Sequence, residues 1–247
     1  MGVLDGKEAL VTGGSRGIGR AIVQRLARDG AQVVFSFHDN KAAAEDVVAA
    51  VDGCGGRAFA VQADQGRMQD LERLFYQADQ HLGGLDILVN NAGINPLTGI
   101  LDVAEPDYDR VMAVNAKGPF FAMQYAARTL PDGGRIINIS TLSTVLPVPG
   151  KALYVASKAA VEQFTAVAAR ELGGRGITVN SVSPGITDTD MLRATNPPES
   201  IAQAAALTAL QRLGQPADIA NVVAFLAGPD SGWITGQNLR VTGGFLM

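Results

Sequence analysis

The sequence predicts an α/β fold in which one parallel sheet carries helices on both faces. Short apolar, β-branched segments alternate with longer helical ones along most of the chain. Two parallel strands need a helix-length crossover between them, so this alternation favours parallel over antiparallel pairing. The chain has 247 residues, 47% of them apolar, and neither a repeat nor a Pro/Ser-rich linker divides it. We therefore predict one doubly wound domain over residues 1–247.

Seven short segments rich in β-branched and apolar residues are expected to form the strands. They are Glu8–Thr12, Gln32–Phe37, Ala58–Gln62, Asp86–Asn90, Arg135–Ile139, Thr178–Val182 and Asn238–Thr242. Between them lie six segments with helical periodicity. These are Gly17–Asp29, Asn40–Cys54, Met68–Leu82, Tyr108–Thr129, Tyr154–Leu172 and Pro216–Leu226.

One long segment, 187–211, breaks this alternation. It contains the turn Asn196-Pro197-Pro198 and then a short apolar stretch, Ser200–Leu210, which we expect to be helical. Connections of this length are uncommon inside a compact domain and often cover a binding site. We therefore expect a substrate lid around residues 187–211.

Composition and charge exclude several classes of protein. Lys and Arg number 20 against 24 Asp and Glu, a net charge of −4, whereas nucleic-acid-binding domains carry a basic face. No apolar run is long enough to span a membrane or to act as a secretion signal. Cys54 is the only cysteine, so we expect no disulfide and no metal site. We expect a cytoplasmic protein that acts on a small molecule, without a nucleic-acid or membrane partner.

A glycine-rich loop follows the first predicted strand and leads directly into the first predicted helix. It reads Thr12-Gly13-Gly14-Ser15-Arg16-Gly17-Ile18-Gly19. Glycines at such a turn let backbone N–H groups and the positive end of the helix approach a pyrophosphate. The spacing, Gly-x3-Gly-x-Gly, differs from the more common Gly-x-Gly-x-x-Gly, and a glycine-rich turn without a ligand is the alternative. The residues expected to contact a dinucleotide are Gly13, Ser15, Arg16, Gly17, Ile18 and Gly19.

The end of the second predicted strand indicates which dinucleotide binds. An acidic side chain at this position binds the ribose 2′-hydroxyl and repels a 2′-phosphate. The sequence has Phe37 there, and Arg16 in the loop can supply a positive charge. His38 either lines the 2′-phosphate pocket or is an exposed turn residue. Asp39 would favour NAD(H) if it reached the pocket, but we expect NADP(H) to be preferred over NAD(H).

Tyr154 and Lys158 stand four residues apart at the start of a predicted helix, which places them on one helix face. A lysine ammonium beside a phenol favours the phenolate and lowers the tyrosine pKa from its usual value of about 10. Such a phenol can donate a proton to a carbonyl oxygen or accept one from an alcohol. The pair alone is weak evidence, because Tyr-x3-Lys occurs by chance on many exposed helices.

Small and polar residues follow the ends of three further predicted strands. Asn90-Asn91-Ala92-Gly93 follows the fourth strand, Ser140-Thr141 follows the fifth, and Pro184-Gly185 follows the sixth. Asn115 is a polar residue within an otherwise apolar helical segment. Ligands of doubly wound sheets bind beyond the carboxyl ends of the strands, so we expect these residues to gather at one edge of the sheet.

Taken together, these segments resemble the signatures of the short-chain dehydrogenase/reductase family over nearly the whole chain. The matching motifs are the Gly13/Gly17/Gly19 loop, Asp64 after the third strand, Asn90-Asn91-Ala92-Gly93, Asn115, Tyr154-x3-Lys158 and Pro184-Gly185. The resemblance implies a seven-stranded Rossmann-type sheet. It also implies hydride transfer between NAD(P) and a carbonyl or secondary alcohol.

The resemblance also implies a role for each matching residue. Tyr154 would be the acid/base, Lys158 would hold the nicotinamide ribose, and Asn115 would anchor a water that relays protons. Asp64 would bind the adenine edge of the cofactor. The remaining contacts would come from Asn90, Ala92 and Gly93 on the ribose side, from Pro184 and Gly185, and from Ile186 and Thr189 near the carboxamide.

The catalytic hydroxyl departs from the family pattern. The family usually has a serine thirteen residues before the tyrosine, and this position is Thr141. A threonine hydroxyl can still polarise a carbonyl, although its methyl group restricts the approach of the substrate. We assign this role to Thr141, with Ser140 as the alternative.

The predicted activity is that of an oxidoreductase that uses NADPH to reduce a ketone to a secondary alcohol, with Tyr154 as proton donor. Apolar residues after the fifth strand and in the lid, such as Leu146 and Met191, suit a hydrophobic or amphipathic substrate. The alternatives are an NAD-dependent alcohol, sugar or steroid dehydrogenase and a 3-oxoacyl-carrier-protein reductase. A non-catalytic nucleotide-binding scaffold is disfavoured, because Tyr154, Lys158 and Asn115 are all present.

Only 18% of the residues are charged, which suggests that other subunits cover part of the surface. The resemblance implies a homotetramer, with a homodimer as the alternative.

Overall fold

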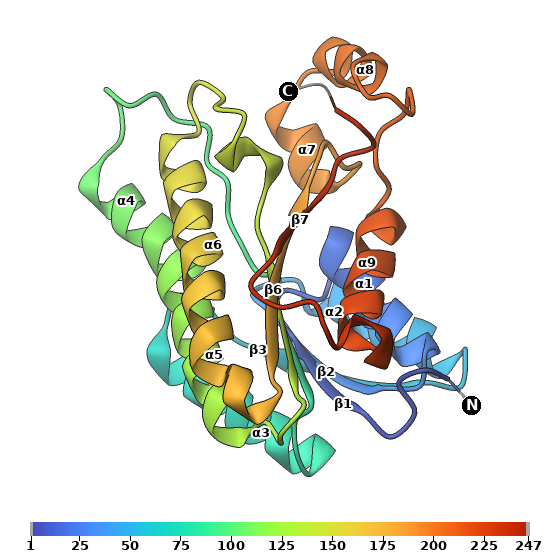
Figure 1. Cartoon of the computed structure of the whole chain (residues 1–247). Helices are drawn as coiled ribbons and strands as arrows, with labels where there is room; N and C mark the ends of the chain where they lie inside the picture. Colours follow the sequence, from blue (N-terminus) through green and yellow to red (C-terminus); the bar gives the residue numbers. More distant parts are fainter. Residues whose placement is uncertain (1, 246–247) are drawn as a thin grey trace.

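Seven parallel strands form the centre of the molecule, in the order β3-β2-β1-β4-β5-β6-β7 (Figure 1). The computed structural model describes residues 2–245. The strands are β1 (Glu8–Val11), β2 (Gln32–Phe37), β3 (Arg57–Gln62), β4 (Ile87–Asn90), β5 (Arg135–Ile139), β6 (Thr178–Pro184) and β7 (Asn238–Val241). This arrangement confirms the predicted doubly wound, seven-stranded parallel sheet.

Helices cover both faces of this sheet, because alternate strand residues point to opposite sides. In β1, Ala9 and Val11 pack against one layer and Leu10 against the other. The first layer contains α1 (Gly17–Arg28), α2 (Lys41–Asp52) and α9 (Pro216–Ala227). The second contains α3 (Met68–Leu82), α5 (Gly118–Thr129) and α6 (Ala152–Leu172). The two layers bury the core on either side of the strands (Figure 1).

Two predicted elements differ from the structure. The helix expected over Tyr108–Thr129 is three consecutive pieces: α4 (Glu105–Met112), a π-helical turn η1 (Ala113–Lys117) and α5. The segment 187–211 contains two short helices, α7 (Asp190–Thr195) and α8 (Pro198–Ala206), where one was expected. Proline at the first position of α8 fits a helix start, because its missing N–H would have no partner there.

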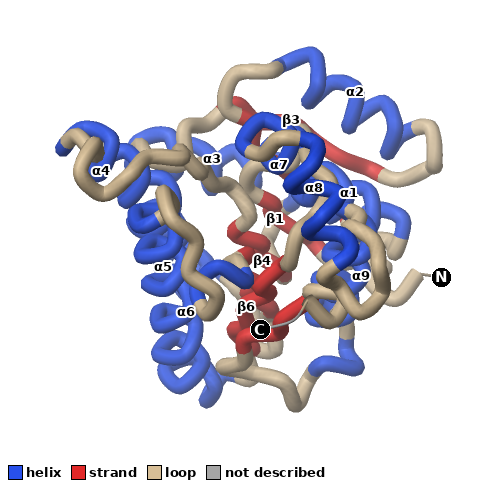
Figure 2. The backbone as a smooth tube through the Cα atoms, turned by 90° about the horizontal axis from the view of Figure 1, so that it is seen from above, coloured by secondary structure: helices blue, strands red, loops and turns tan. Residues whose placement is uncertain are grey.

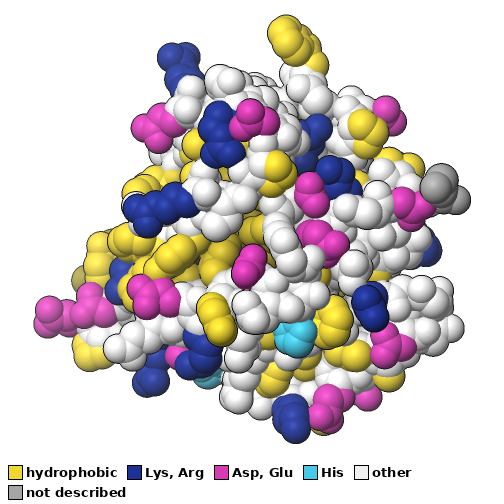
Figure 3. All heavy atoms as spheres, turned by 90° about the horizontal axis from the view of Figure 1, so that it is seen from below, with side chains coloured by type: hydrophobic (Ala, Val, Ile, Leu, Met, Phe, Trp, Pro, Cys, Tyr) yellow, Lys and Arg dark blue, Asp and Glu magenta, His cyan; other side chains and the backbone are white. Residues whose placement is uncertain are grey.

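The helices α7 and α8 lie above the carboxyl ends of the strands. Figure 2 shows them in the view from above, with the strand ends below them and the layer of α4, α5 and α6 to one side. In the view from below, basic and acidic side chains are interspersed (Figure 3), in keeping with the small net charge. No helix among residues 2–245 has the length and apolar character needed to cross a membrane.

Candidate active site

One cavity of about 630 Å³ runs along the carboxyl edge of the sheet. In the sheet order, β1 has β2 on one side and β4 on the other, so the order of the strands reverses at this point. Doubly wound sheets bind ligands at such a position. Asn90 and Asn115 do not line it. The other predicted site residues do, namely Gly13, Ser15, Arg16, Gly17, Ile18, Gly19, His38, Asp64, Ala92, Gly93, Ser140, Thr141, Tyr154, Lys158, Pro184, Gly185, Ile186 and Thr189.

The glycine loop at one end of the cavity is held in a shape that other residues could not adopt easily. Gly13 and Gly17 have φ values of 69° and 53°, in the left-handed region that favours glycine. A Cβ on Gly19 would lie 2.0 Å from the carbonyl oxygen of Gly13. Asn91 ties the loop to β4, because its Nδ2 donates to the carbonyl oxygens of Thr12 (3.0 Å) and Gly13 (2.9 Å). The loop is thus fixed with its backbone close to the cavity.

The structure separates the roles of the two neighbouring asparagines. Asn90 ends β4 with its side chain in the core, where Nδ2 donates to Oδ1 of Asn138 at 2.9 Å. These two residues are register partners on β4 and β5, so the bond joins adjacent strands. Asn91 lines the cavity, although the sequence reasoning had not selected it. The two asparagines are distinguished by the alternation of side chains between the two faces of a strand. This signal can be used only once the end of the strand is known.

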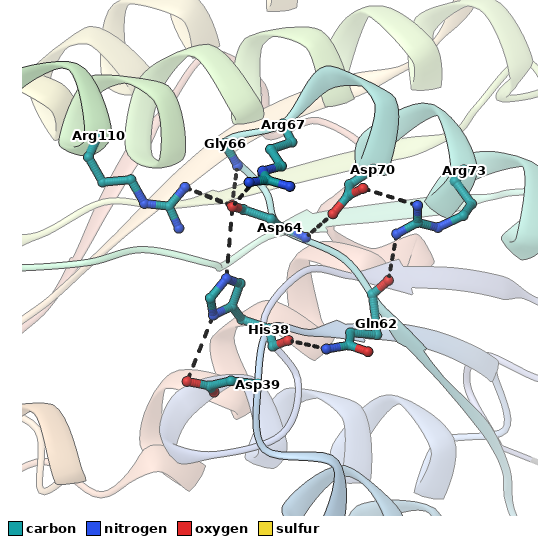
Figure 4. Close-up of polar contacts among 9 residues, drawn as sticks. All are labelled: His38, Asp39, Gln62, Asp64, Gly66, Arg67, Asp70, Arg73 and Arg110. Atoms are coloured by element: carbon teal, nitrogen blue, oxygen red, sulfur yellow. Dashed lines mark hydrogen bonds and ion pairs between the residues drawn. The ribbon is translucent and has the colours of Figure 1, made fainter. Parts of the chain in front are cut away.

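Asp64 follows the edge strand β3 at the same carboxyl edge of the sheet and lies among several nitrogen atoms (Figure 4). Its carboxylate accepts hydrogen bonds from Gly66 N (2.9 Å) and from Nη1 of Arg110 (2.9 Å). Arg67 and His38 lie at 3.7 and 3.8 Å from it. Burial tends to raise the pKa of Asp64, but the hydrogen bonds from Gly66 and Arg110 outweigh it and hold this pKa below its usual value. The sequence reasoning missed Arg110, which is 46 residues away along the chain.

The expected 2′-phosphate region contains both charge signs. Phe37 is only 6% exposed and belongs to the core, so the strand tip offers no carboxylate. Arg16 precedes α1 and lines the cavity together with His38 and Asp39. His38 Nδ1 lies 3.8 Å from Asp39 Oδ2, and the Asp39 side chain is 81% exposed. Arg16 and His38 are therefore placed to receive an anion, with Asp39 beside them.

Asn115 sits in the π-helical turn and is completely buried. Its Oδ1 accepts from Ile94 N at 2.9 Å, and its Nδ2 donates to Ile94 O at 2.8 Å and to Ser157 Oγ at 3.1 Å. Ser157 lies on α6 between Tyr154 and Lys158. Asn115 therefore fixes the loop after β4 against the helix that carries the predicted acid/base, and π turns of this kind are frequent at functional sites.

Tyr154 and Lys158 occupy one face of α6, one turn apart. Lys158 is 4% exposed, its Nζ donates to the carbonyl oxygen of Ile139 at 2.8 Å, and burial lowers its pKa to about 8. Burial raises the pKa of Tyr154, and the opposing influence is a side-chain hydrogen bond with Thr141. The expected lowering by Lys158 is thus not seen, because burial dominates and the ammonium is turned to a backbone carbonyl.

The two candidate hydroxyls have different partners. Ser140 is 3% exposed and its Oγ donates to Oε1 of Glu162 at 2.5 Å. Glu162 also accepts a hydrogen bond from Oγ1 of Thr144 at 2.8 Å, so two hydroxyl groups near the end of β5 share this carboxylate. Thr141 instead lies next to Tyr154 and accepts a hydrogen bond from Ser143 N at 3.2 Å. Of the two, only Thr141 acts on the pKa of Tyr154, which its side-chain hydrogen bond lowers against the effect of burial.

Apolar side chains surround the part of the cavity beyond Tyr154. They come from the loop after β5, from the segment of α7 and α8 and from the C-terminal segment, and include Leu146, Val148, Met191, Ile201 and Phe245. Lys151 and Asn95 also line this part of the wall, and the sequence reasoning had selected neither. No group of three or more His, Cys, Asp or Glu side chains in the described part of the chain could hold a metal ion.

Comparison with known proteins shows which family the chain belongs to. Residues 13–246 match the family model described as enoyl-(acyl carrier protein) reductase. An uncharacterized oxidoreductase of Methylorubrum extorquens is 44% identical over 246 residues, 99% of each chain. A blue fluorescent protein from a metagenomic library, solved with NADPH, is 45% identical with a TM-score of 0.93 over 99% of each chain. The angucycline C-6 ketoreductase LanV, solved with NADP, is 44% identical with a TM-score of 0.94 over 99% of this chain and 97% of that one.

A match of this extent, with the glycine loop and the Tyr154/Lys158 pair in one cavity and the buried Asn115 behind it, identifies an oxidoreductase. The chain belongs to the short-chain dehydrogenase/reductase family.

Proposed function

We propose that the protein reduces a ketone to a secondary alcohol with NADPH. The observation that carries this proposal is the convergence of Tyr154, Thr141 and Lys158 at the middle of a cavity whose one end is the glycine loop. The apolar wall at the other end suits the carbon skeleton of a hydrophobic or amphipathic ketone. LanV, a ketoreductase with bound NADP, supports both the reaction and the cofactor.

NADPH, when bound along the glycine loop and Lys158, would supply the hydride for this reduction. Tyr154 donates its phenolic proton to the carbonyl oxygen, so the product is a neutral alcohol. Burial raises the pKa of this phenol, which keeps it protonated and ready to donate at neutral pH. Thr141 holds the same carbonyl oxygen through its hydroxyl, since it already lies beside the phenol. Lys158 has N–H donors beyond the one used by Ile139 and would hold the nicotinamide ribose.

Substitution of Tyr154 separates chemistry from binding. Tyr154→Phe removes the proton donor, and we expect NADPH oxidation with a ketone to fall by at least about 100-fold. The affinity for NADPH, measured by fluorescence titration, should change little, because the glycine loop and Lys158 are untouched. Retention of activity in this variant would show that another group donates the proton.

Preference for NADPH rests on Arg16 and His38 at the 2′-phosphate region. Arg16→Ala should weaken NADPH binding about tenfold or more, because a charged hydrogen bond is worth roughly 1.5–3 kcal/mol. The same substitution should leave NADH binding within about twofold. Equal weakening of both cofactors would show that Arg16 acts on the shared pyrophosphate.

A second candidate is an NAD-dependent alcohol dehydrogenase, favoured by one observation. The carboxylate of Asp39 lines the cavity beside His38 and would bind a ribose 2′-hydroxyl. Tighter binding of NADH than of NADPH to the unmodified protein would favour this candidate, and oxidation of secondary alcohols would then be the reaction to measure.

We also propose that the chain assembles through α5 and α6. Phe120 on α5 and Val167 on α6 are 43% and 54% exposed, and Phe120 packs edge-on against Phe164 of α6. Light scattering with size-exclusion chromatography should give the mass of a homotetramer, and a monomer would exclude this surface as an interface.

A further inference from the structure

Lys151 is a cation in the cavity that no step of the proposed reaction uses. It stands at the end of the loop after β5, immediately before α6, and it lines the cavity with Leu146 and Val148. It precedes Tyr154 by three residues, so the two side chains start about one helical turn, roughly 5 Å, apart along the axis.

The position of Lys151 is unfavourable for the free protein in three ways. Burial lowers its pKa, and no carboxylate among residues 2–245 offsets this. It occupies the N-cap of a 21-residue helix without capping it, where Ser, Thr, Asp or Asn is preferred. Its charge also faces the positive end of the helix dipole. Local stability therefore gives no reason for a lysine here, and such conflicts between local rules and sequence are typical of functional positions.

The cofactor phosphates do not explain this lysine. Arg16 and His38 follow β1 and β2, whereas Lys151 follows β5. In the sheet order, β5 lies two strand spacings from β1 and three from β2, which at about 4.8 Å per spacing is on the order of 10 Å and 14 Å. Lys151 thus belongs to the substrate half of the cavity, among the apolar side chains.

A second polar group without a partner lies in the same wall. Oδ1 of Asn95 is buried and makes no hydrogen bond within the described chain. The loop that carries it is fixed to the loop before α6, because Thr98 N donates to Gly150 O at 2.9 Å. Asn95 and Lys151 therefore come from two segments that are held together at the substrate side.

We propose that Lys151 binds an anionic group of the substrate, which makes the substrate an apolar ketone that also carries a carboxylate or an ionised acidic hydroxyl. This inference rests on the proposed ketone reduction. The anion would pair with the ammonium in a part of the cavity with apolar walls, where charge–charge attraction is weakly screened. The positive end of α6 would add to that attraction. Asn95 would bind a neutral polar group of the same substrate.

Paired probes that differ only in charge test this proposal. We would compare 3- and 4-acetylbenzoate with their methyl esters, using NADPH and the full-length chain. Wild-type kcat/KM should be higher for the acids than for the esters. Lys151→Met should reduce kcat/KM for the acids about tenfold more than for the esters, and Lys151→Arg should largely restore the preference. Lys41→Met, at an exposed lysine on α2, is the matched control and should alter neither rate.

Thermal unfolding distinguishes binding from a structural role. Without ligand, Lys151→Met should raise Tm by about 2 °C, because it removes an uncompensated charge. A lower Tm, or an equal loss of activity towards acids and esters, would overturn the proposal.

Calorimetric titration with benzoate measures the affinity of the same site for an anion, without turnover. Weaker benzoate binding to Lys151→Met than to the wild type supports the anion site, and equal affinity overturns it. If the wild type reduces no ketone, the proposed function fails, and this titration still decides the role of Lys151. An ionised phenol, 4-nitrophenolate, in place of benzoate distinguishes the two kinds of anion.

Discussion

Replacement of Gly19 by alanine adds one methyl group at the most crowded point of the glycine loop. Gly19 lies in the first turn of α1, where its backbone is ordinary helix and alanine is otherwise favourable. Because Gly19 has no side chain, the carbonyl oxygen of Gly13 and Nδ2 of Asn91 can approach its Cα closely. The substitution therefore tests space alone, separate from backbone conformation.

The magnitude follows from the distances. A Cβ on Gly19 would lie 2.0 Å from the Gly13 oxygen and 2.5 Å from the Asn91 nitrogen, so the loop must move by roughly 1 Å. Overpacking of this kind costs about 1–3 kcal/mol of folding free energy. A displacement of about 1 Å in a positioning element can reduce turnover about 100-fold. We expect NADPH affinity to fall at least about tenfold and kcat/KM about 100-fold.

Fluorescence titration with NADPH and thermal unfolding measure these effects. Gly173→Ala is the matched control, because a Cβ there meets no atom within 4 Å and the φ of −58° suits alanine. That variant should bind NADPH as the wild type does. Wild-type NADPH affinity in Gly19→Ala would refute the loop geometry and with it the dinucleotide site.

Three further predictions concern Thr141, Lys158 and the buried Asn115 behind the cavity. Thr141→Ala should lower kcat/KM about 100-fold with Thr141→Ser restoring most of it, whereas Ser140→Ala should mainly cost stability, about 1–2 kcal/mol, in urea unfolding. Because burial lowers the pKa of Lys158 to about 8, the unfolded chain binds more protons between that pH and about 10.4. Stability of the wild type relative to Lys158→Met should therefore rise by up to about 3 kcal/mol as pH increases through this window, and a constant difference in urea unfolding would contradict the burial. Asn115→Ala removes three hydrogen bonds of a buried side chain, so it should cost about 2–4 kcal/mol of unfolding free energy and slow turnover; unchanged stability would contradict the bracing role.

The strands and most helices could be predicted because the apolar residues within each element recur with the period of a strand or of a helix. Alternating layers in β1 and the amphipathic pattern of α1 are local properties of the sequence. The glycine loop was also predictable, since its position between a strand and a helix is visible in the chain. Local patterns were thus sufficient for the architecture and for one end of the cavity.

Contacts that join distant segments were not predictable in this way. Arg110 reads as one more charge on an exposed helix, and only the packing of α4 beside the loop after β3 brings it to Asp64. Similarly, the π-helical turn at Asn115 depends on a hydrogen-bonding partner, Ile94, that lies on another segment. The helix α7 also lacks a strong sequence signal, because six residues are too few for a periodicity to show.

Two lysines that line the cavity, the buried Lys158 and the half-buried Lys151, differ in how the protein compensates their charge. Lys158 donates to the Ile139 carbonyl, whereas Lys151 has no carboxylate partner among residues 2–245. Lys151, the N-cap of α6, and Lys158, seven residues later on the helix, both line the same cavity. If Lys158 holds the cofactor ribose and Lys151 an anion of the substrate, each ligand offsets one of the two burial costs. Ligands that bind only the folded chain stabilise it by mass action, so Tm should rise in two steps, with NADPH and then with the anionic probe. The second step should disappear in Lys151→Met while the first remains, because the two lysines act on different ligands.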